Sequence, residues 1–161
     1  MKRLSTFLPR PLFGLLLVIT LLVTPSCTHN GGDLDGLFGT WHLDRITIDG
    51  QPDKAYDGTI IWKFQFDVVA MMPTDDAQHQ RFEGWGTWSF APDDHKVLLL
   101  HYIHYDDKRE PGDPFYSPLP ATHLPAGELA LDIDHLGSSG MQLTYHDPST
   151  STAYTYYFTK W

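Results

Sequence analysis

The amino-acid sequence predicts an all-β protein: one eight-stranded antiparallel up-and-down β-barrel, preceded by a short N-terminal helical turn. Three observations support this fold class. Apolar and polar residues alternate with a period of two in most segments, and β-branched and aromatic residues dominate these segments. Turn-forming residues separate them. Long and short connections also alternate along the chain, which favours a barrel with all its long loops at one end.

A leader precedes the predicted barrel. Three basic residues near the N-terminus are followed by an apolar run over residues 12–23. This order is typical of a secretory signal peptide, and the run is shorter than the ~20 residues that a membrane-spanning helix needs. We therefore predict a signal peptide over residues 1–26 and a barrel domain over residues 37–161.

The end of the leader resembles a bacterial lipoprotein signal. Cys27 is the single cysteine of the chain, and Ser26 is a typical small residue before a lipidated cysteine. The resemblance implies a lipid anchor on Cys27 and attachment to the outer membrane of the cell envelope, facing the periplasm or the surface. The polar, Gly-rich residues 27–36 would then be a flexible tether. The alternative is plain secretion with an unmodified cysteine.

The chain that remains after removal of the leader is strongly acidic. The leader carries three of the 11 Lys+Arg residues and none of the 20 Asp+Glu residues, which leaves eight basic against 20 acidic residues and a formal charge of −12. Such a surface repels phosphate backbones and anionic lipid headgroups. We therefore predict no nucleic-acid partner and no membrane contact except through the anchor. A single cysteine also excludes an intramolecular disulfide.

The first three predicted strands differ in how clearly they alternate. Residues 39–48 form the first strand, and residues 60–68 alternate throughout, as in a sheet with one buried face. A weak break near Asp67 separates this second strand from a third, residues 68–72. The inward face of the second strand is predicted to be Ile60, Trp62, Phe64, Phe66 and Val68.

Five further strands complete the predicted barrel. Residues 81–90 place two glycines on the inward face beside aromatic residues, which indicates either local space or bulges. Residues 96–105 are apolar on both faces near their middle, as if partly covered on the outside. The last three strands cover residues 128–134, 141–145 and 152–161, with Leu129, Leu131, Ile133, Met141, Leu143 and Tyr145 inward.

The connections fall into two sets. Those near Asp67, at 92–95 and at 135–139 are short, whereas those at 49–57, 73–79, 106–127 and 147–151 are longer.

The longest connection, residues 106–127, is long for a compact domain and is stiffened by five prolines. Phe115, Tyr116 and Leu119 of this segment could fold back over the open mouth. We predict either a proline-stiff surface excursion or a contact with a ligand or partner.

The order of these features resembles a lipocalin, and more closely the lipocalin-like lipoproteins of Bacteroidetes. A turn at "DLDGLFG" precedes the motif Gly39-Thr40-Trp41 on the first strand, and the chain ends in "YYFTKW". The segment "LDIDHLGSSGMQLTY" also resembles that group. The resemblance covers residues 34–161 and implies that Trp41 packs across the closed end with Lys160 against it. Lysine stands here where arginine is usual, and the T-D-Y motif of lipocalins is absent.

Residues that could carry chemistry are dispersed. "GSSG" at residues 137–140 lacks the last glycine of a G-x-S-x-G nucleophile elbow and reads as a turn. His101 and His104 are three apart on a strand, so they point to opposite faces, and no H-x-x-x-H motif occurs. Paired aspartates fall in predicted turns. We therefore predict no catalytic residue, no metal ligand and no cofactor.

Two functions from different classes remain open, and an enzyme or metal protein built on the histidines is a distant third. The first is a non-catalytic barrel that binds a small apolar or amphipathic molecule. The second is a filled barrel that binds another envelope protein through the outward aromatic residues Trp85, Tyr154 and Tyr156. The predicted ligand contacts of the first are Trp62, Phe64, Trp88, Ile103, Phe115 and Tyr116.

Overall fold

The computed structural model describes residues 36–74, 83–103 and 114–161. The predicted signal peptide, the lipid site Cys27 and almost all of the predicted tether lie outside the described residues. Within the described ranges, no helix is long and apolar enough to cross a bilayer.

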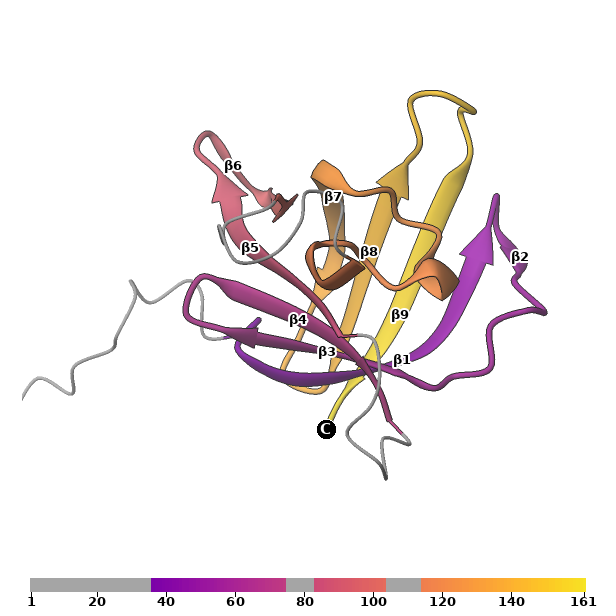
Figure 1. Cartoon of the computed structure of the whole chain (residues 1–161), viewed down its shortest axis with the longest axis horizontal. Coiled ribbons are helices and arrows are strands. Elements are labelled where there is room, and N and C mark those ends of the chain that lie inside the picture. Colours follow the sequence, from indigo (N-terminus) through magenta and orange to yellow (C-terminus); the bar gives the residue numbers. More distant parts are fainter. Residues whose placement is uncertain (1–35, 75–82, 104–113) are drawn as a thin grey trace, which may run out of the picture. The chain divides into compact units, whose positions relative to one another are not determined.

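The described strands form one antiparallel sheet in the order β2-β1-β3-β4-β5-β6-β7-β8-β9, so that from β3 onward each strand pairs with the next along the chain (Figure 1). β1 pairs with both β3 and β9, so the sheet closes into an eight-stranded barrel. β2 is a short extra strand at the edge of β1. This topology confirms the predicted fold class. The strands are β1 (Gly39–Ile48), β2 (Gln51–Pro52), β3 (Ile60–Gln65), β4 (Val68–Pro73), β5 (Gly84–Ala91), β6 (Asp94–Tyr102), β7 (Gly127–Leu136), β8 (Gly140–His146) and β9 (Ala153–Lys160).

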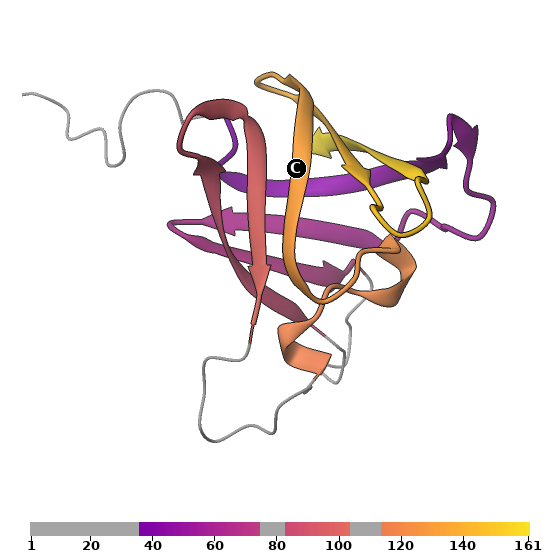
Figure 2. The same cartoon turned by 90° about the horizontal axis from the view of Figure 1, so that it is seen from above.

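The two ends of the barrel are built differently. At the closed end, where β1 begins and β9 ends, hairpins at 66–67, 92–93 and 137–139 join neighbouring strands. At the other end, the mouth, the connections are longer, and two 3-10 helices, η1 (Pro114–Tyr116) and η2 (Pro120–Thr122), lie there. Figure 2 shows both helices (orange) at the end of the barrel opposite the hairpins. The predicted separation of short and long connections is therefore observed.

The strand β2 replaces part of a predicted loop. Asp49 and Gly50 have φ angles of 50° and 77°, so two consecutive residues adopt the left-handed conformation. This pair is typical of a two-residue β-hairpin turn, in which an Asp-Gly sequence is favoured. The hairpin brings Gln51 opposite Ile48 and Pro52 opposite Thr47.

The predicted inward positions of Phe66 and Val68 are wrong, since Val69 rather than Val68 pairs with the inward Phe64 and is fully buried. β3 ends at Gln65, which pairs with Val68, so Phe66 and Asp67 form the hairpin turn. Phe66 has a φ angle of 53° and its side chain is 60% exposed. The sequence lacks a glycine or asparagine to mark this turn, and the apolar alternation continues across it into β4. The predicted break near Asp67 lies within the observed turn.

The predicted helical turn before β1 lies partly outside the described residues. Within them, Gly36 and Leu37 form a turn and Leu37 is fully buried.

The core fills the inside of the barrel, because alternate residues of each strand point inward. The predicted inward residues of β7 and β8 are buried or half-buried: Leu129, Leu131, Ile133, Met141, Leu143 and Tyr145. Tryptophan and tyrosine side chains make up much of its volume. The largest fully buried side chains are Trp41, Trp62, Tyr156, Phe64, Leu37, Leu43, Ile46, Met71, Leu98, Leu100, Leu131 and Leu143.

Candidate functional site

An aromatic cluster centred on Trp62 occupies the interior. The Trp62 side chain is fully buried, and its ring centroid lies 5.0 Å from that of Phe158 and 5.8 Å from that of Tyr156. Phe64, two residues later on the same inward face of β3, lies 6.2 Å away. Edge and tilted packing of this kind is the favoured geometry for aromatic rings. The cluster joins β3 to β9 across the inside of the barrel.

A second aromatic group surrounds Trp88 of β5. Its ring meets those of Phe38, Phe64 and Phe90 edge to face, at centroid distances of 5.7, 5.8 and 5.6 Å. Phe64 therefore contacts both Trp62 and Trp88 and links the two groups.

Three hydrogen-bonding groups in this interior have no partner among the residues that the structure describes. They are the indole Nε1 of Trp62, the indole Nε1 of Trp88 and the hydroxyl of Tyr102; the buried hydroxyl of Thr47, next to the inward Ile46 on β1, also has no partner there. The three residues are 0%, 6% and 2% exposed. A buried polar group without a hydrogen bond costs about 1–3 kcal/mol, so most such groups in proteins are paired. Three unpaired groups in one small interior therefore need an explanation.

The interior is electrically neutral. In the described part of the chain, the buried polar or charged residues are three threonines, Thr47, Thr122 and Thr144. Burial raises the pKa of Tyr102 and of Tyr156 far above the ordinary value, so both phenols stay protonated. No buried side chain of the described ranges could neutralise a charged molecule inside the barrel.

The inward glycines of β5 do not leave open space. A Cβ atom on Gly84 would lie 2.3 Å from the backbone oxygen of Ser117, which belongs to the segment between the two 3-10 helices. A Cβ on Gly86 would lie 2.8 Å from the backbone oxygen of His101 and 3.1 Å from the ring of Tyr102. Gly84 and Gly86 thus let another chain segment and an aromatic ring approach the wall closely.

Residues 114–124, here called the plug, cover the mouth of the barrel. Leu119 and Leu124 are 8% and 7% exposed and join the core cluster, and Thr122 is fully buried. The hydroxyl of Tyr156, from inside the barrel, donates a hydrogen bond of 2.8 Å to the backbone oxygen of Thr122. Phe115 stacks on Trp85 at a centroid distance of 5.8 Å and an interplanar angle of 17°.

The plug is also attached on its outer side. His123, with a φ angle of 59°, lies 2.8 Å through Nε2 from a carboxylate oxygen of Asp53, and its ring stacks on Tyr154. The hydrogen bond from His123, assisted by the backbone N–H of Ala55, lowers the pKa of Asp53. This contact joins the plug to the connection that follows β2.

The closed end is sealed by a separate set of contacts. The indole Nε1 of Trp41 donates a 2.7 Å hydrogen bond to the backbone oxygen of Leu37. The Nζ of Lys160 lies 4.9 Å from the centroid of the Trp41 ring, within cation–π range, and donates a 3.1 Å hydrogen bond to the oxygen of Gly36. Gly39, with a φ of 120°, lies beside the Lys160 side chain.

Two solved structures share this architecture. A lipocalin-like protein from Bacteroides uniformis aligns with a TM-score of 0.54 at 16% identity, covering 78% of this chain and 99% of that chain. An uncharacterized protein from Bacteroides eggerthii aligns with a TM-score of 0.53 at 16% identity, covering 77% and 98%. No family model and no curated protein matches the sequence. The fold is lipocalin-like.

The predicted ligand contacts occupy three places in the lipocalin-like barrel. Trp62, Phe64 and Trp88 lie in the interior. Phe115 and Tyr116 are half-buried neighbours in the plug, with ring centroids 5.1 Å apart. Ile103 lies apart from both groups, because it follows β6 and is 43% exposed, while Tyr102 takes the inward position.

The predicted outward position of Tyr156 is wrong. Tyr156 pairs with Ile46 of β1 and Leu143 of β8, and all three point into the lipocalin-like barrel. Trp85 and Tyr154 are half-buried, and each stacks on a plug residue, Phe115 or His123. The outward aromatic surface predicted for a partner is therefore smaller than expected.

Sequence reasoning missed two residues of the site, Tyr102 and Thr122. Tyr102 follows Leu98 and Leu100 with a period of two, so its inward position was available from the strand pattern. Its place opposite the side-chain-free Gly86 depends on the β5–β6 register. The burial of Thr122 depends on the path of the plug, for which the sequence carries no periodic signal.

The histidines do not form a metal site in the described ranges. No group of three or more histidine, cysteine, aspartate or glutamate residues comes together there to hold an ion. Four described histidines instead lie beside single carboxylates on separate elements, and His104 is outside the described residues. The pairs are His42–Asp44, His101–Glu128, His123–Asp53 and His146–Asp132.

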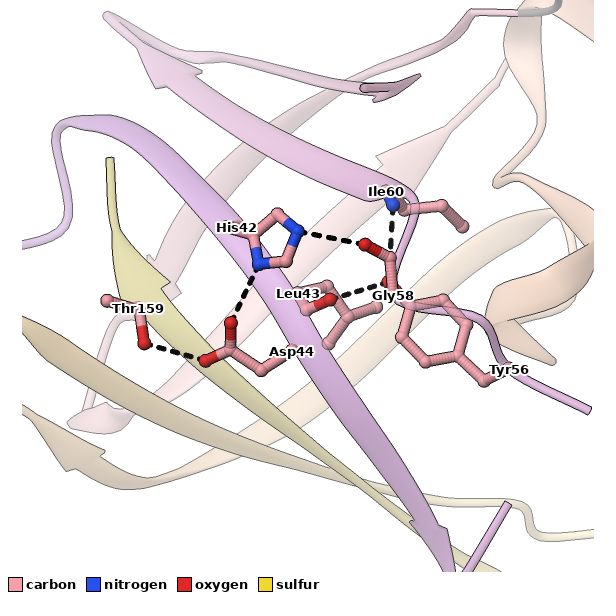
Figure 3. A network of polar contacts seen from close by, with 7 residues as sticks. All are labelled: His42, Leu43, Asp44, Tyr56, Gly58, Ile60 and Thr159. Carbon is pink, nitrogen blue, oxygen red and sulfur yellow. Dashed lines mark hydrogen bonds and ion pairs between the residues drawn. The ribbon is translucent and has the colours of Figure 1, made fainter. Parts of the chain in front are cut away.

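One histidine belongs to a polar network on the outer face of β1 (Figure 3). His42 lies 2.7 Å from Asp44 through Nδ1 and 2.8 Å from the oxygen of Gly58 through Nε2. The Thr159 hydroxyl donates to the other carboxylate oxygen of Asp44, at 2.6 Å. A nucleophile needs its hydroxyl on the imidazole, whereas Thr159 and His42 here share the carboxylate. The network therefore ties β1 to β9 and to the connection before β3.

Proposed function

We propose that this protein is a lipid-anchored barrel of the cell envelope that binds a small apolar or amphipathic molecule in its interior, without catalysis. The observation that carries this proposal is the set of three unpartnered donors, on Trp62, Trp88 and Tyr102, inside a lipocalin-like barrel. Leaving these donors unpaired costs free energy, and that free energy is recovered when a bound molecule accepts hydrogen bonds from them. A purely structural core gains nothing from these groups.

The contact surface follows from the same residues. Trp62, Phe64 and Trp88 offer aromatic faces and edges inside the barrel, and Phe115 and Tyr116 belong to the plug that covers it. Ile103, the exposed residue that follows β6, would lie on the rim of the entry path.

The location is a separate part of the proposal. The basic start, the apolar run and Cys27 support export, lipidation and attachment to the outer membrane. Fractionation of cells that express the natural chain or Cys27→Ser tests this. We expect the natural chain in the membrane fraction and the variant in the soluble envelope fraction, and an equal distribution would contradict the anchor.

A filled barrel that binds another envelope protein is the second candidate. It is favoured by the closure of the interior, since the space beside Gly84 and Gly86 is taken by Ser117 and Tyr102. In that case the plug would be a fixed part of the core rather than a movable cover.

Native mass spectrometry of the lipid-free domain, purified from its own host, separates the two candidates. A small molecule that is retained in the gas phase and lost on denaturation supports ligand binding. The matched control is the same domain with Tyr102→Phe, which keeps the fold and removes one donor, so we expect it to retain less of that molecule. A domain that carries no retained mass in either form favours the filled barrel.

A further inference from the structure

We infer that the ligand is uncharged and carries at least one hydrogen-bond acceptor, such as the oxygen of a ketone, ester or ether, and that the unpartnered donors of the interior, on Trp62, Trp88 and Tyr102, are the groups available to bond to it. This inference rests on the proposed function and deepens it by naming the chemical class of the ligand.

Because the unpartnered groups are hydrogen-bond donors, the ligand must offer them an acceptor. An indole Nε1 is a donor only, so the ligand atom that faces Trp62 or Trp88 must be an acceptor. The hydroxyl of Tyr102 can donate as well, because burial raises its pKa and keeps it protonated. A pure hydrocarbon would leave all three groups unpaired.

The absence of buried charged side chains in the described residues indicates that the ligand is uncharged. A carboxylate or phosphate taken from water into an apolar interior without a cation is strongly disfavoured. The buried polar side chains of the described ranges are threonines, and Lys160 faces Trp41 at the closed end. The molecule around the barrel is also strongly acidic, with a formal charge of −9 for the whole chain, which further disfavours an anion.

The plug lies beside two of the three donors. Trp62 contacts the ring of Tyr156, and the Tyr156 hydroxyl holds the backbone of Thr122 in the plug. Tyr102 packs on Gly86, one inward position along β5 from the site where Gly84 meets Ser117. Displacement of the plug therefore opens the barrel at Trp62 and Tyr102, which makes this segment the entry for the ligand.

Trp88 is expected to contribute least. Its ring is surrounded edge to face by Phe38, Phe64 and Phe90, and an N–H that meets an aromatic face recovers part of the energy of a hydrogen bond. Trp62 and Tyr102 therefore carry most of the discrimination between an acceptor and a hydrocarbon.

Three probes of equal length test the class of ligand. They are methyl hexyl ketone, the alkene in which a methylene group replaces the carbonyl oxygen, and octanoate. Binding to the full barrel domain is followed by intrinsic tryptophan fluorescence and by calorimetry. We expect the ketone to bind about fivefold to tenfold more tightly than the alkene for each hydrogen bond formed. Above the pKa of its carboxyl group, octanoate should bind more weakly than the ketone.

The variants test the donors. Tyr102→Phe and Trp62→Phe should each reduce the ratio of ketone to alkene affinity by about fivefold. The ratio is the readout because a loss of packing weakens both probes alike. Trp41→Phe is the matched control: it removes an indole whose N–H is already bonded to Leu37, so the ratio should stay unchanged. Thermal melts verify that each variant is folded.

Each outcome decides a different part of the account. Equal affinities for ketone and alkene overturn the inference but leave ligand binding intact. Tighter binding of octanoate than of the ketone overturns the neutral class. If neither ketone nor alkene binds to the natural domain, the proposed function fails and the inference fails with it.

Discussion

The closed end and the mouth of this barrel are both covered, but by different means. At the closed end, tight hairpins and the Trp41 ring seal the barrel, and the Trp41 indole is hydrogen-bonded to Leu37. At the mouth, a distant segment of the chain, the plug, is held by the hydrogen bond from Tyr156 to Thr122, by the contact of His123 with Asp53 and by packing on Gly84. Inside the barrel, the indole groups of Trp62 and Trp88 have no partner in the described residues, and Trp88 lies towards the closed end, where its backbone N–H bonds to Asp67 of the β3–β4 hairpin.

This difference distinguishes polar groups that stabilise the fold from polar groups that lower its stability. At the closed end, the indole of Trp41 and the ammonium of Lys160 are hydrogen-bonded locally, as in a purely structural region. The barrel interior retains unsatisfied donors on Trp62, Trp88 and Tyr102, which reduce stability unless something binds them. Regions that bind ligands commonly carry such costs, because the residues are selected for the bound state.

The largest expected effect is at the contact between the plug and the wall. Gly84→Ala places a Cβ 2.3 Å from the backbone oxygen of Ser117, so the plug must shift. We expect a loss of about 3 kcal/mol in the free energy of unfolding, measured by urea denaturation. Gly140→Ala, at the closed end, is the control, because its Cβ would meet nothing closer than 3.8 Å. Similar midpoints for Gly84→Ala and the natural chain would contradict this account of the mouth.

The next largest effect is expected from removing the hydrogen bond between the plug and the barrel. Tyr156→Phe leaves the buried backbone oxygen of Thr122 unpaired and should cost about 1–2 kcal/mol. Amide hydrogen exchange should become faster in residues 119–124 and remain unchanged at the closed end. Tyr157→Phe is the control, since its ring keeps its contact with Arg45, 3.8 Å away. Uniform acceleration along the chain would argue against a separately held plug.

At the closed end, Lys160→Met tests the seal on Trp41. The variant keeps the length of the side chain but loses the cation over the Trp41 ring and the hydrogen bond to Gly36. We expect about 1 kcal/mol lower stability in urea and no change in the binding of the ketone probe. A change in ketone affinity would show that the two ends are coupled.

The smallest expected effect is the pH dependence of the outer attachment of the plug. The pKa of Asp53 is lowered in the folded protein, so the attachment stabilises above the ordinary carboxyl pKa and is lost as the pH falls through the lowered value. At neutral pH, the free energy of unfolding of Asp53→Asn should therefore be about 0.5 kcal/mol below that of the natural chain. The difference between the two should be smaller in acid, at about pH 2. A difference that grows on acidification would contradict this sign.

The sequence was sufficient for the barrel and its two ends. Period-two alternation located the strands, and the lengths of the connections separated the hairpins at 92–93 and 137–139 from the longer loops. Turns without glycine or asparagine were harder to place, because Phe66 continues the alternation of β3 into its own turn.

The site was predicted only in part. Trp62, Phe64 and Trp88 were found because inward aromatic residues follow from strand periodicity. The position of Ser117 against Gly84, and the bond between Tyr156 and Thr122, join residues more than 30 positions apart and depend on the path of an irregular segment. Whether a buried donor has a partner likewise depends on packing and is not encoded in local pattern.

Nuclear magnetic resonance of the tryptophan indole N–H groups tests the central claim most directly. In the domain alone, Trp41 should show a hydrogen-bonded indole, whereas Trp62 and Trp88 should show the shifts of unbonded groups. On addition of methyl hexyl ketone, the resonance of Trp62 should move downfield and that of Trp41 should remain in place. A Trp62 resonance that stays unchanged at saturating ketone, or moves no more than that of Trp41, would contradict the account.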